Sequence, residues 1–231
     1  MAQRGTEGPF EVVAGLERVR DRIAAAGGDP SGVRVVAVTK GFGPEAVVAA
    51  RDAGVLDAGE NYAQELLAKD EVLRRSGPGD PGVRWHFLGA IQRNKVAGLA
   101  PVVSCWQSVA RAVEGEAIAR RRPGAAVLVE VDTTGVPGRN GCAPGAVAAL
   151  VADLRAGGLD VEGLMTVAPV GPDAARAAFR VVRALADDLG LVERSMGMSD
   201  DLELAVAEGA TMVRVGRALF GDRPARRMHT T

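Results

Sequence analysis

Short apolar runs recur along the chain and alternate with segments in which apolar residues lie three and four positions apart. The short runs are typical of buried strands, and the longer spacing indicates amphipathic helices. Strands are therefore predicted at residues 34–40, 55–60, 83–89, 102–107, 126–132, 160–167, 193–197 and 211–216.

Helical patterns fill most of the intervals between these strands. A first amphipathic helix is predicted at about residues 10–26, where a Gly-Gly-Asp-Pro sequence ends it. A second helix opens at Pro44, a residue favoured in the first turn. The remaining predicted helices cover residues 63–75, 94–99, 109–121, 144–156, 172–189 and 200–208.

Strand–helix alternation at this spacing implies right-handed crossovers and a parallel sheet. Eight strands between about residues 33 and 221 fit an α/β fold that is a single (β/α)8 TIM barrel. An open doubly wound sheet is the alternative. Because no linker-like or low-complexity segment interrupts the pattern, residues 1–231 are expected to form one domain.

Composition narrows the class of protein. The chain has 231 residues, a net charge of −1 and 47% hydrophobic residues, so nothing points to nucleic acid or an anionic membrane surface. No apolar run approaches the roughly 20 residues that span a bilayer, and no signal peptide is evident. Two cysteines favour a reducing cytoplasm, and two cysteines and two histidines without ligand spacing predict no metal site. No long apolar interface helix is visible, so a monomer is expected.

In a parallel barrel, functional residues collect where the strands end. Polar residues and glycines crowd those ends in this sequence. Ser199 leads into a helix and Gly216 follows the last strand, and both places offer backbone N–H groups to a phosphate. Taken singly, each residue has a plainer interpretation, because serine is a common helix cap and glycine a common turn residue.

Lys40 closes the first predicted strand and is one of only three lysines, with Lys69 and Lys95. An amine at the mouth of a barrel is desolvated and lies near other cations, which lowers a lysine pKa. The neutral amine can then condense with a carbonyl group. Position alone favours a lysine that extends to solvent or forms an ion pair. The convergence of Asn61, Arg214 and the predicted phosphate site on the same mouth favours the reactive amine instead.

Five motifs follow one another along the chain: VAVTK (36–40), GENYAQE (59–65), WHFLGAIQRNK (85–95), GLMTVAP (163–169) and the segment 195–221, which begins SMGMSDD. In this order they resemble the pyridoxal 5′-phosphate (PLP) homeostasis protein family, and the resemblance runs from about Val33 to Gly221. It implies a PLP-binding barrel of the alanine racemase type (PLP fold type III) without that enzyme's C-terminal β domain.

The resemblance also implies roles for individual residues. Lys40 matches the lysine that forms a Schiff base with PLP, and Asn61 matches a residue beside the cofactor. Arg214 matches the arginine that faces the pyridine nitrogen. His86 matches a position near the ring, although a hydrogen-bonded core histidine is an equally good interpretation.

Further matches concern the phosphate and the pocket wall. Ser199, Gly216 and Arg217 match the phosphate site, and Met165 and Ser195 match the pocket lining. One residue departs from the family pattern, because many members have threonine where this chain has Arg217. That change removes a hydroxyl ligand but keeps the backbone N–H, and a guanidinium can approach the phosphate instead.

The same residues favour a carrier over a catalyst. A guanidinium such as Arg214 can only donate hydrogen bonds, so the ring nitrogen stays neutral and the ring is a weaker electron sink. Racemisation with two bases needs a second acid–base group, and the only tyrosine, Tyr62, has no extra domain to position it. The expected function is intracellular PLP homeostasis, with apo-PLP enzymes as transient partners. The alternatives are a slow amino-acid racemase and a PLP-free aldolase that uses Lys40.

Overall fold

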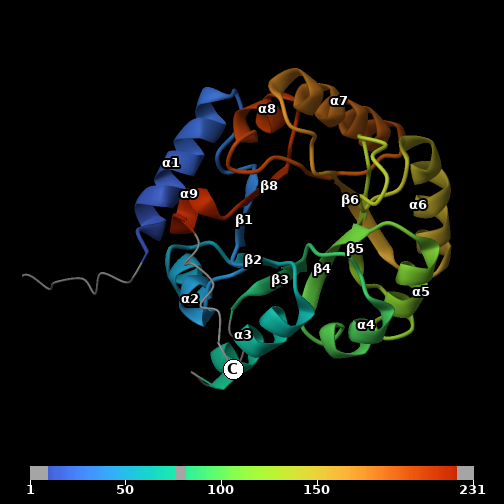
Figure 1. Ribbon diagram of the computed structural model, residues 1–231, viewed down its shortest axis with the longest axis horizontal. Helices are drawn as coiled ribbons and strands as arrows, with labels where there is room; N and C mark the ends of the chain where they lie inside the picture. Colours follow the sequence, from blue (N-terminus) through green and yellow to red (C-terminus); the bar gives the residue numbers. More distant parts are fainter. Residues whose placement is uncertain (1–9, 76–81, 223–231) are drawn as a thin grey trace, which may run out of the picture.

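The computed structural model describes residues 10–75 and 82–222. Eight strands pair in sequence order, all in parallel, and the last pairs with the first, so the sheet closes into a barrel (Figure 1). This confirms the predicted barrel and excludes the open doubly wound sheet. The strands are β1 (Arg34–Val38), β2 (Asp57–Glu60), β3 (Arg84–Phe87), β4 (Val103–Val109), β5 (Ala126–Glu130), β6 (Asp160–Met165), β7 (Glu193–Ser195) and β8 (Met212–Val215).

Helices surround the barrel and cover the outer faces of the strands (Figure 1). None in the described part of the chain is long and apolar enough to cross a membrane. The helices are α1 (Val12–Ala25), α2 (Pro44–Asp52), α3 (Ala63–Arg75), α4 (Arg93–Leu99), α5 (Ala112–Ala119), the 3-10 turn η1 (Pro144–Ala146), α6 (Val147–Ala156), α7 (Pro172–Asp188), α8 (Leu202–Ala207) and α9 (Arg217–Phe220).

The predicted helix at 109–121 begins too early, because Val109 still belongs to β4 and α5 starts only at Ala112. The reason is a buried cap. The Glu114 carboxylate accepts hydrogen bonds from the backbone N–H groups of Ala110 (2.8 Å) and Arg111 (3.1 Å). Those bonds satisfy donors that have no partner within the helix, and so they fix where it begins.

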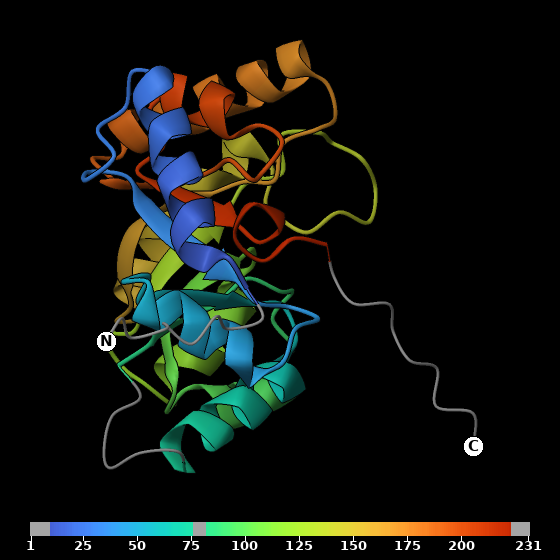
Figure 2. The ribbon, with the colours of Figure 1, turned by 90° about the vertical axis from the view of Figure 1, so that its left-hand side faces the viewer.

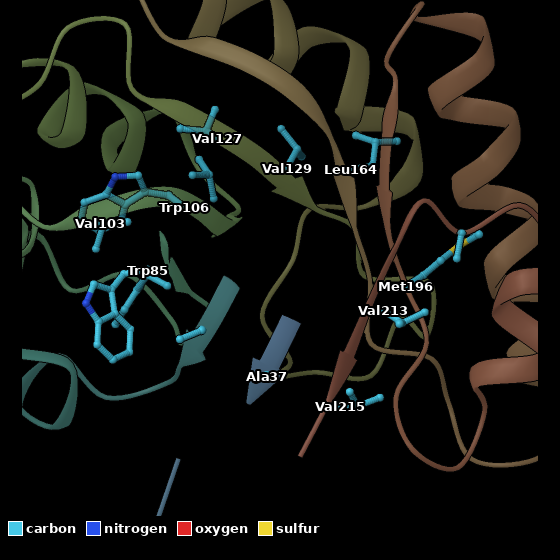
Figure 3. Packing of buried hydrophobic residues seen from close by; sticks show 14 of the residues in the cluster. Ala37, Trp85, Val103, Trp106, Val127, Val129, Leu164, Met196, Val213 and Val215 are labelled. Atoms are coloured by element: carbon cyan, nitrogen blue, oxygen red, sulfur yellow. The ribbon is translucent and has the colours of Figure 1, made fainter. Parts of the chain in front are cut away.

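The core lies between the strands and the helices. Branched apolar side chains from neighbouring strands, among them Val127, Val129 and Leu164, belong to one buried hydrophobic cluster (Figure 3). The two tryptophans, Trp85 and Trp106, are fully buried. Strands of a parallel barrel are buried on both faces, which explains why the apolar runs are so clear in the sequence.

Helix α1 lies outside the ring and packs against α8 and α9 (Figures 1 and 2). Its contact with α9 is close, because a Cβ atom on Gly15 would lie only 2.7 Å from the carbonyl oxygen of Ala218. Helix α1 therefore supports the segment that follows β8, where the sequence predicts a phosphate site.

Candidate functional site

A cavity of about 560 Å³ opens at the C-terminal ends of the strands. This volume lies within the range of pockets that hold small molecules and cofactors. Seven of the nine residues predicted from the sequence line it, on segments far apart along the chain. They are Lys40, Asn61, Met165, Ser199, Arg214, Gly216 and Arg217.

The three lysines have different surroundings. Lys40 follows β1 and lines the large cavity. Lys95 lines a smaller neighbouring cavity of about 130 Å³. Lys69, on α3, is buried, and its Nζ donates a hydrogen bond to the carbonyl oxygen of Thr39 (2.8 Å) and another to a carboxylate oxygen of Glu60. Only Lys40 therefore combines a strand end with the large cavity.

Two acidic side chains hold the chain on either side of Lys40: Glu60, which is fully buried, and Glu65, which is 34% exposed. Thr39 donates its hydroxyl to Glu60 (2.7 Å), and the N–H of Gly41 donates to Glu65 (3.0 Å). Burial raises the pKa of Glu60, while the ammonium of Lys69 opposes that rise. The Glu60–Lys69 ion pair thus fixes the strand end from which Lys40 extends.

One end of the cavity has the features of an anion site. The N–H of Ala218 points at the hydroxyl of Ser199 (3.4 Å). A Cβ atom on Gly216 would lie 3.0 Å from the carbonyl oxygen of Val38, so glycine keeps this part of the wall open. Backbone N–H groups and a hydroxyl in such a turn are suited to a phosphate.

Arg22 of α1 supports this end from behind. Its guanidinium donates to the carbonyl oxygen of Ser199 (2.9 Å) and forms two hydrogen bonds with the Glu203 carboxylate (2.5 and 2.7 Å). Because Arg22 lies about 180 residues from both partners in sequence, this contact joins the first helix to the predicted phosphate loop.

Arg217 stands at the rim of the cavity, where its guanidinium forms an ion pair with Asp200. Both side chains are more than half exposed. Exposed pairs of this kind contribute little free energy, so Arg217 can exchange its carboxylate partner for a phosphate at small cost.

Arg214 is buried at the cavity floor. It donates to the carbonyl oxygen of Ser195 (2.7 Å), the hydroxyl of Ser195 (2.8 Å) and the carbonyl oxygen of Thr166 (2.7 Å). Burial lowers the pKa of Arg214 to about 10, which still leaves the guanidinium charged at neutral pH. Within the described residues these bonds account for three of its five N–H donors, so two remain for a ligand.

Asn61 is placed by a tight backbone contact. A Cβ atom on Gly89 would lie 1.9 Å from the carbonyl oxygen of Asn61, so only glycine allows the two loops to meet. The side-chain oxygen Oδ1 of Asn61 is buried and has no hydrogen-bond partner among the residues that the structure describes. A buried acceptor of this kind calls for a partner, and a ligand in the cavity can supply one.

The other two predicted residues lie deeper in the barrel and do not line the cavity. His86 hydrogen-bonds Asp57 (2.9 Å) and Gln107 (2.7 Å), in agreement with the interpretation as a core histidine. Ser195 accepts from Arg214 and donates to Gln107 (2.7 Å). Neither His86 nor Ser195 lines the cavity, but Ser195 contacts Arg214, which does.

The sequence reasoning missed several residues of the site. Phe42, Leu88 and Met198 line the cavity, and their apolar character gave no sign of a binding role. Arg22 and Gln107 act on the site through other residues, and nothing local distinguishes them from a surface arginine and a strand glutamine. Proximity in sequence to Lys40 could have indicated Phe42.

Comparison with known proteins adds the following findings. The family model "Alanine racemase, N-terminal domain" matches residues 16–224. The pyridoxal phosphate homeostasis protein of Pseudomonas aeruginosa is 41% identical over 215 residues, which cover 89% of this chain and 91% of that protein. The protein of the same name from Deinococcus radiodurans is 43% identical over 222 residues, covering 91% of this chain and 100% of the relative.

Solved structures of similar proteins have the same fold as this chain. PipY from Synechococcus elongatus PCC7942 with PLP bound is 31% identical, has a TM-score of 0.75 and covers 88% of this chain and all of PipY. A protein from Bifidobacterium adolescentis is 34% identical with a TM-score of 0.82, covering 91% of this chain and 94% of that one. Lysine decarboxylase from Selenomonas ruminantium, at 15% identity and a TM-score of 0.67, shares the fold alone.

Proposed function

The chain belongs to the pyridoxal phosphate homeostasis protein family, and on that premise we propose that it holds PLP as a Schiff base on Lys40 and acts as an intracellular carrier or regulator of this cofactor. The observation that carries the proposal is the placement of the lysines. Of the three in the chain, only Lys40 lines the cavity that also contains two guanidinium groups.

The residues of the cavity fit PLP. The amine of Lys40 would bond the aldehyde, while Ser199, Gly216 and Arg217 would hold the phosphate at the anion site. The buried oxygen of Asn61 lacks a partner that a bound ligand can provide. Cavity volume, charge and the orphaned acceptor all match a small anionic aldehyde.

Arg214 supports a carrier over a catalyst. When bound, PLP supplies an electron sink for reactions of amino acids, and the sink is strongest when the ring nitrogen is protonated. Arg214 can only donate, and it stays charged at neutral pH, so a ring nitrogen facing it stays unprotonated. This arrangement weakens carbanion chemistry while leaving binding intact.

The position of the tyrosine supports the same proposal. A racemase needs an acid–base group on the face of the cofactor opposite the lysine. Tyr62 is 57% exposed and lines the smaller cavity beside Lys95. No tyrosine is found among the described residues that line the large cavity, so Tyr62 does not supply such a group there.

The first experiment locates the covalent bond. The protein is incubated with PLP, reduced with borohydride, digested and analysed by mass spectrometry. The pyridoxyl group should lie on Lys40, and Lys95→Ala, which removes the amine of the neighbouring cavity, should leave the yield unchanged. Lys40→Ala should lose the adduct yet retain weaker, phosphate-anchored binding. An adduct on Lys69 or Lys95, or none, would refute the proposal.

The second experiment tests the carrier role. The PLP-loaded protein is mixed with an apo-PLP enzyme and an excess of a scavenger that captures free PLP. Recovery of enzyme activity despite the scavenger supports delivery. Robust interconversion of D- and L-amino acids by the purified protein, abolished in Lys40→Ala, would instead establish the racemase and overturn the carrier role.

A further inference from the structure

A run of buried polar side chains crosses the interior of the barrel from the cavity floor towards the opposite end. The interior of such barrels is normally filled by branched apolar side chains, so an unbroken polar run needs an explanation. Each member is at most 5% exposed. In order from the cavity the members are Arg214 on β8, Ser195 on β7, Gln107 on β4, His86 on β3 and Asp57 on β2.

Every neighbouring pair in this run is joined by a short hydrogen bond. Arg214 Nη1 lies 2.8 Å from Ser195 Oγ, which lies 2.7 Å from Gln107 Oε1. The other end of the amide, Gln107 Nε2, lies 2.7 Å from His86 Nδ1. His86 Nε2 lies 2.9 Å from Asp57 Oδ1. The five side chains are therefore connected through the core without a gap.

The direction of these hydrogen bonds is set by Arg214. A guanidinium has no acceptor, so Ser195 must accept from it and can use its single proton only for Gln107 Oε1. The NH₂ end of Gln107 then faces His86 Nδ1. The same Nε2 also donates to the sulfur of Met212 (3.0 Å). If the amide were flipped, its oxygen would face that sulfur instead, and no hydrogen bond could form. The hydroxyl of Ser195, which donates to one end of the amide, and the sulfur of Met212, which accepts from the other end, thus agree on the amide orientation.

At the end of the run away from the cavity, donor and acceptor follow the same direction as at Arg214. Because His86 Nδ1 accepts, the ring carries its proton on Nε2, which donates to the carboxylate of Asp57. Burial alone would raise the pKa of Asp57, but hydrogen bonds from His86 and Arg84 outweigh it and hold the pKa well below its usual value. Arg84 makes two bonds to this carboxylate (2.8 and 2.6 Å), which keeps the acceptor ionised.

We propose that Gln107 and His86 are positioning residues for Arg214. Gln107, held in turn by His86, accepts the hydroxyl proton of Ser195 and keeps the oxygen of Ser195 turned to Arg214. The pair thereby fixes the direction in which the guanidinium presents its remaining donors to the cavity. The inference rests on the proposed function in so far as Arg214 faces bound PLP. It extends the site to residues that touch neither the cavity nor the cofactor.

The cofactor end is tested with two variants of one residue. Gln107→Leu removes the acceptor of Ser195 and should raise the Kd for PLP about tenfold, as expected for one buried hydrogen bond. Gln107→Glu keeps that acceptor and should stay within about threefold of wild type. A purely structural role predicts the reverse order, because a buried carboxylate costs more than an apolar side chain. Equal or reversed affinities would overturn the proposal.

The far end is read without PLP, by nitrogen NMR of ¹⁵N-histidine-labelled apo protein. The chain has one other histidine, His229, so a His229→Gln background leaves a single imidazole. At neutral pH, His86 should carry its proton on Nε2 and none on Nδ1. Arg214→Glu replaces the donor by an acceptor, which reverses the run and should place a proton on Nδ1.

Arg217→Glu is the matched control, because it makes the same charge change at the cavity outside the run. It should leave Nδ1 unprotonated. A proton on Nδ1 in the wild type, no change in folded Arg214→Glu, or an equal change in Arg217→Glu would overturn the proposal. If Arg214→Glu does not fold, the wild-type tautomer and the two Gln107 variants still decide. Absence of PLP binding by the wild type would refute the proposed function and leave the NMR result standing.

Discussion

Replacement of Lys69 by methionine tests how the Lys40 strand end is held. Lys69 is 4% exposed and Glu60 is 0% exposed, so the methionine would leave a carboxylate buried without its counter-ion. Breaking a buried ion pair by removing one partner typically costs about 3–5 kcal/mol. For a chain of this length that corresponds to a melting temperature lower by roughly 6–20 °C.

The loss of stability in Lys69→Met should depend on pH, and the pKa of Glu60 determines whether it grows or shrinks as the pH rises. Burial already raises the pKa of Glu60 in the folded protein, and without Lys69 it rises further. A raised folded pKa gives stability that is present below the unfolded value of about 4.3 and lost as pH increases. The deficit of Lys69→Met relative to wild type should therefore be small near pH 4.5 and grow as the pH rises above it.

Urea unfolding followed by tryptophan fluorescence measures this deficit, because Trp85 and Trp106 are both buried in the folded state. The control is the double variant Glu60→Gln/Lys69→Met, which removes both charges and keeps an acceptor for Thr39. It should recover most of the lost stability at neutral pH and lose the pH dependence. A Lys69→Met protein within about 1 kcal/mol of wild type at every pH, or a double variant no better than the single one, would refute the reasoning.

Three further outcomes are expected. The lowered pKa of Asp57 means that its carboxylate stabilises the fold above the unfolded pKa of about 3.9 and that this stabilisation is lost below it. The difference in unfolding free energy between wild type and Asp57→Asn, measured by urea titration, should therefore narrow between neutral pH and about pH 3. A constant difference would contradict this. Gly89→Ala forces a Cβ atom against the carbonyl oxygen of Asn61, so it should destabilise the protein by about 1–3 kcal/mol or more and weaken PLP binding. Thermal shift measures the stability and fluorescence titration measures the affinity. An unchanged affinity for PLP would count against the role of Asn61. Arg217→Ala should weaken PLP binding severalfold, and more at low than at high salt. Asp200→Asn removes the ion-pair partner of the same guanidinium and should strengthen PLP binding. If wild type and both variants gave the same titration curve, Arg217 would be excluded as a phosphate ligand.

The sequence alone was sufficient to predict the barrel and the end of the barrel at which the cavity lies. Strand periodicity is a local property, and short buried aliphatic runs such as Val127–Val129 show it whatever their neighbours in space. Parallel strands bring their ends to one face, so Lys40, Arg214 and Gly216 were expected to meet before any distance was known. The start of α5 was missed, because its cap depends on the buried carboxylate of Glu114.

Only the tertiary structure distinguished the three lysines and assigned the deeper residues. Whether an amine reaches a cavity or a buried acid depends on which helix packs over which strand, and Lys69 meets Glu60 only after α3 folds back on β2. His86 is linked to Arg214 through side chains from strands that are distant in sequence. Contacts of this kind arise from barrel closure, which sets the register between strands, and no local pattern of residues encodes them.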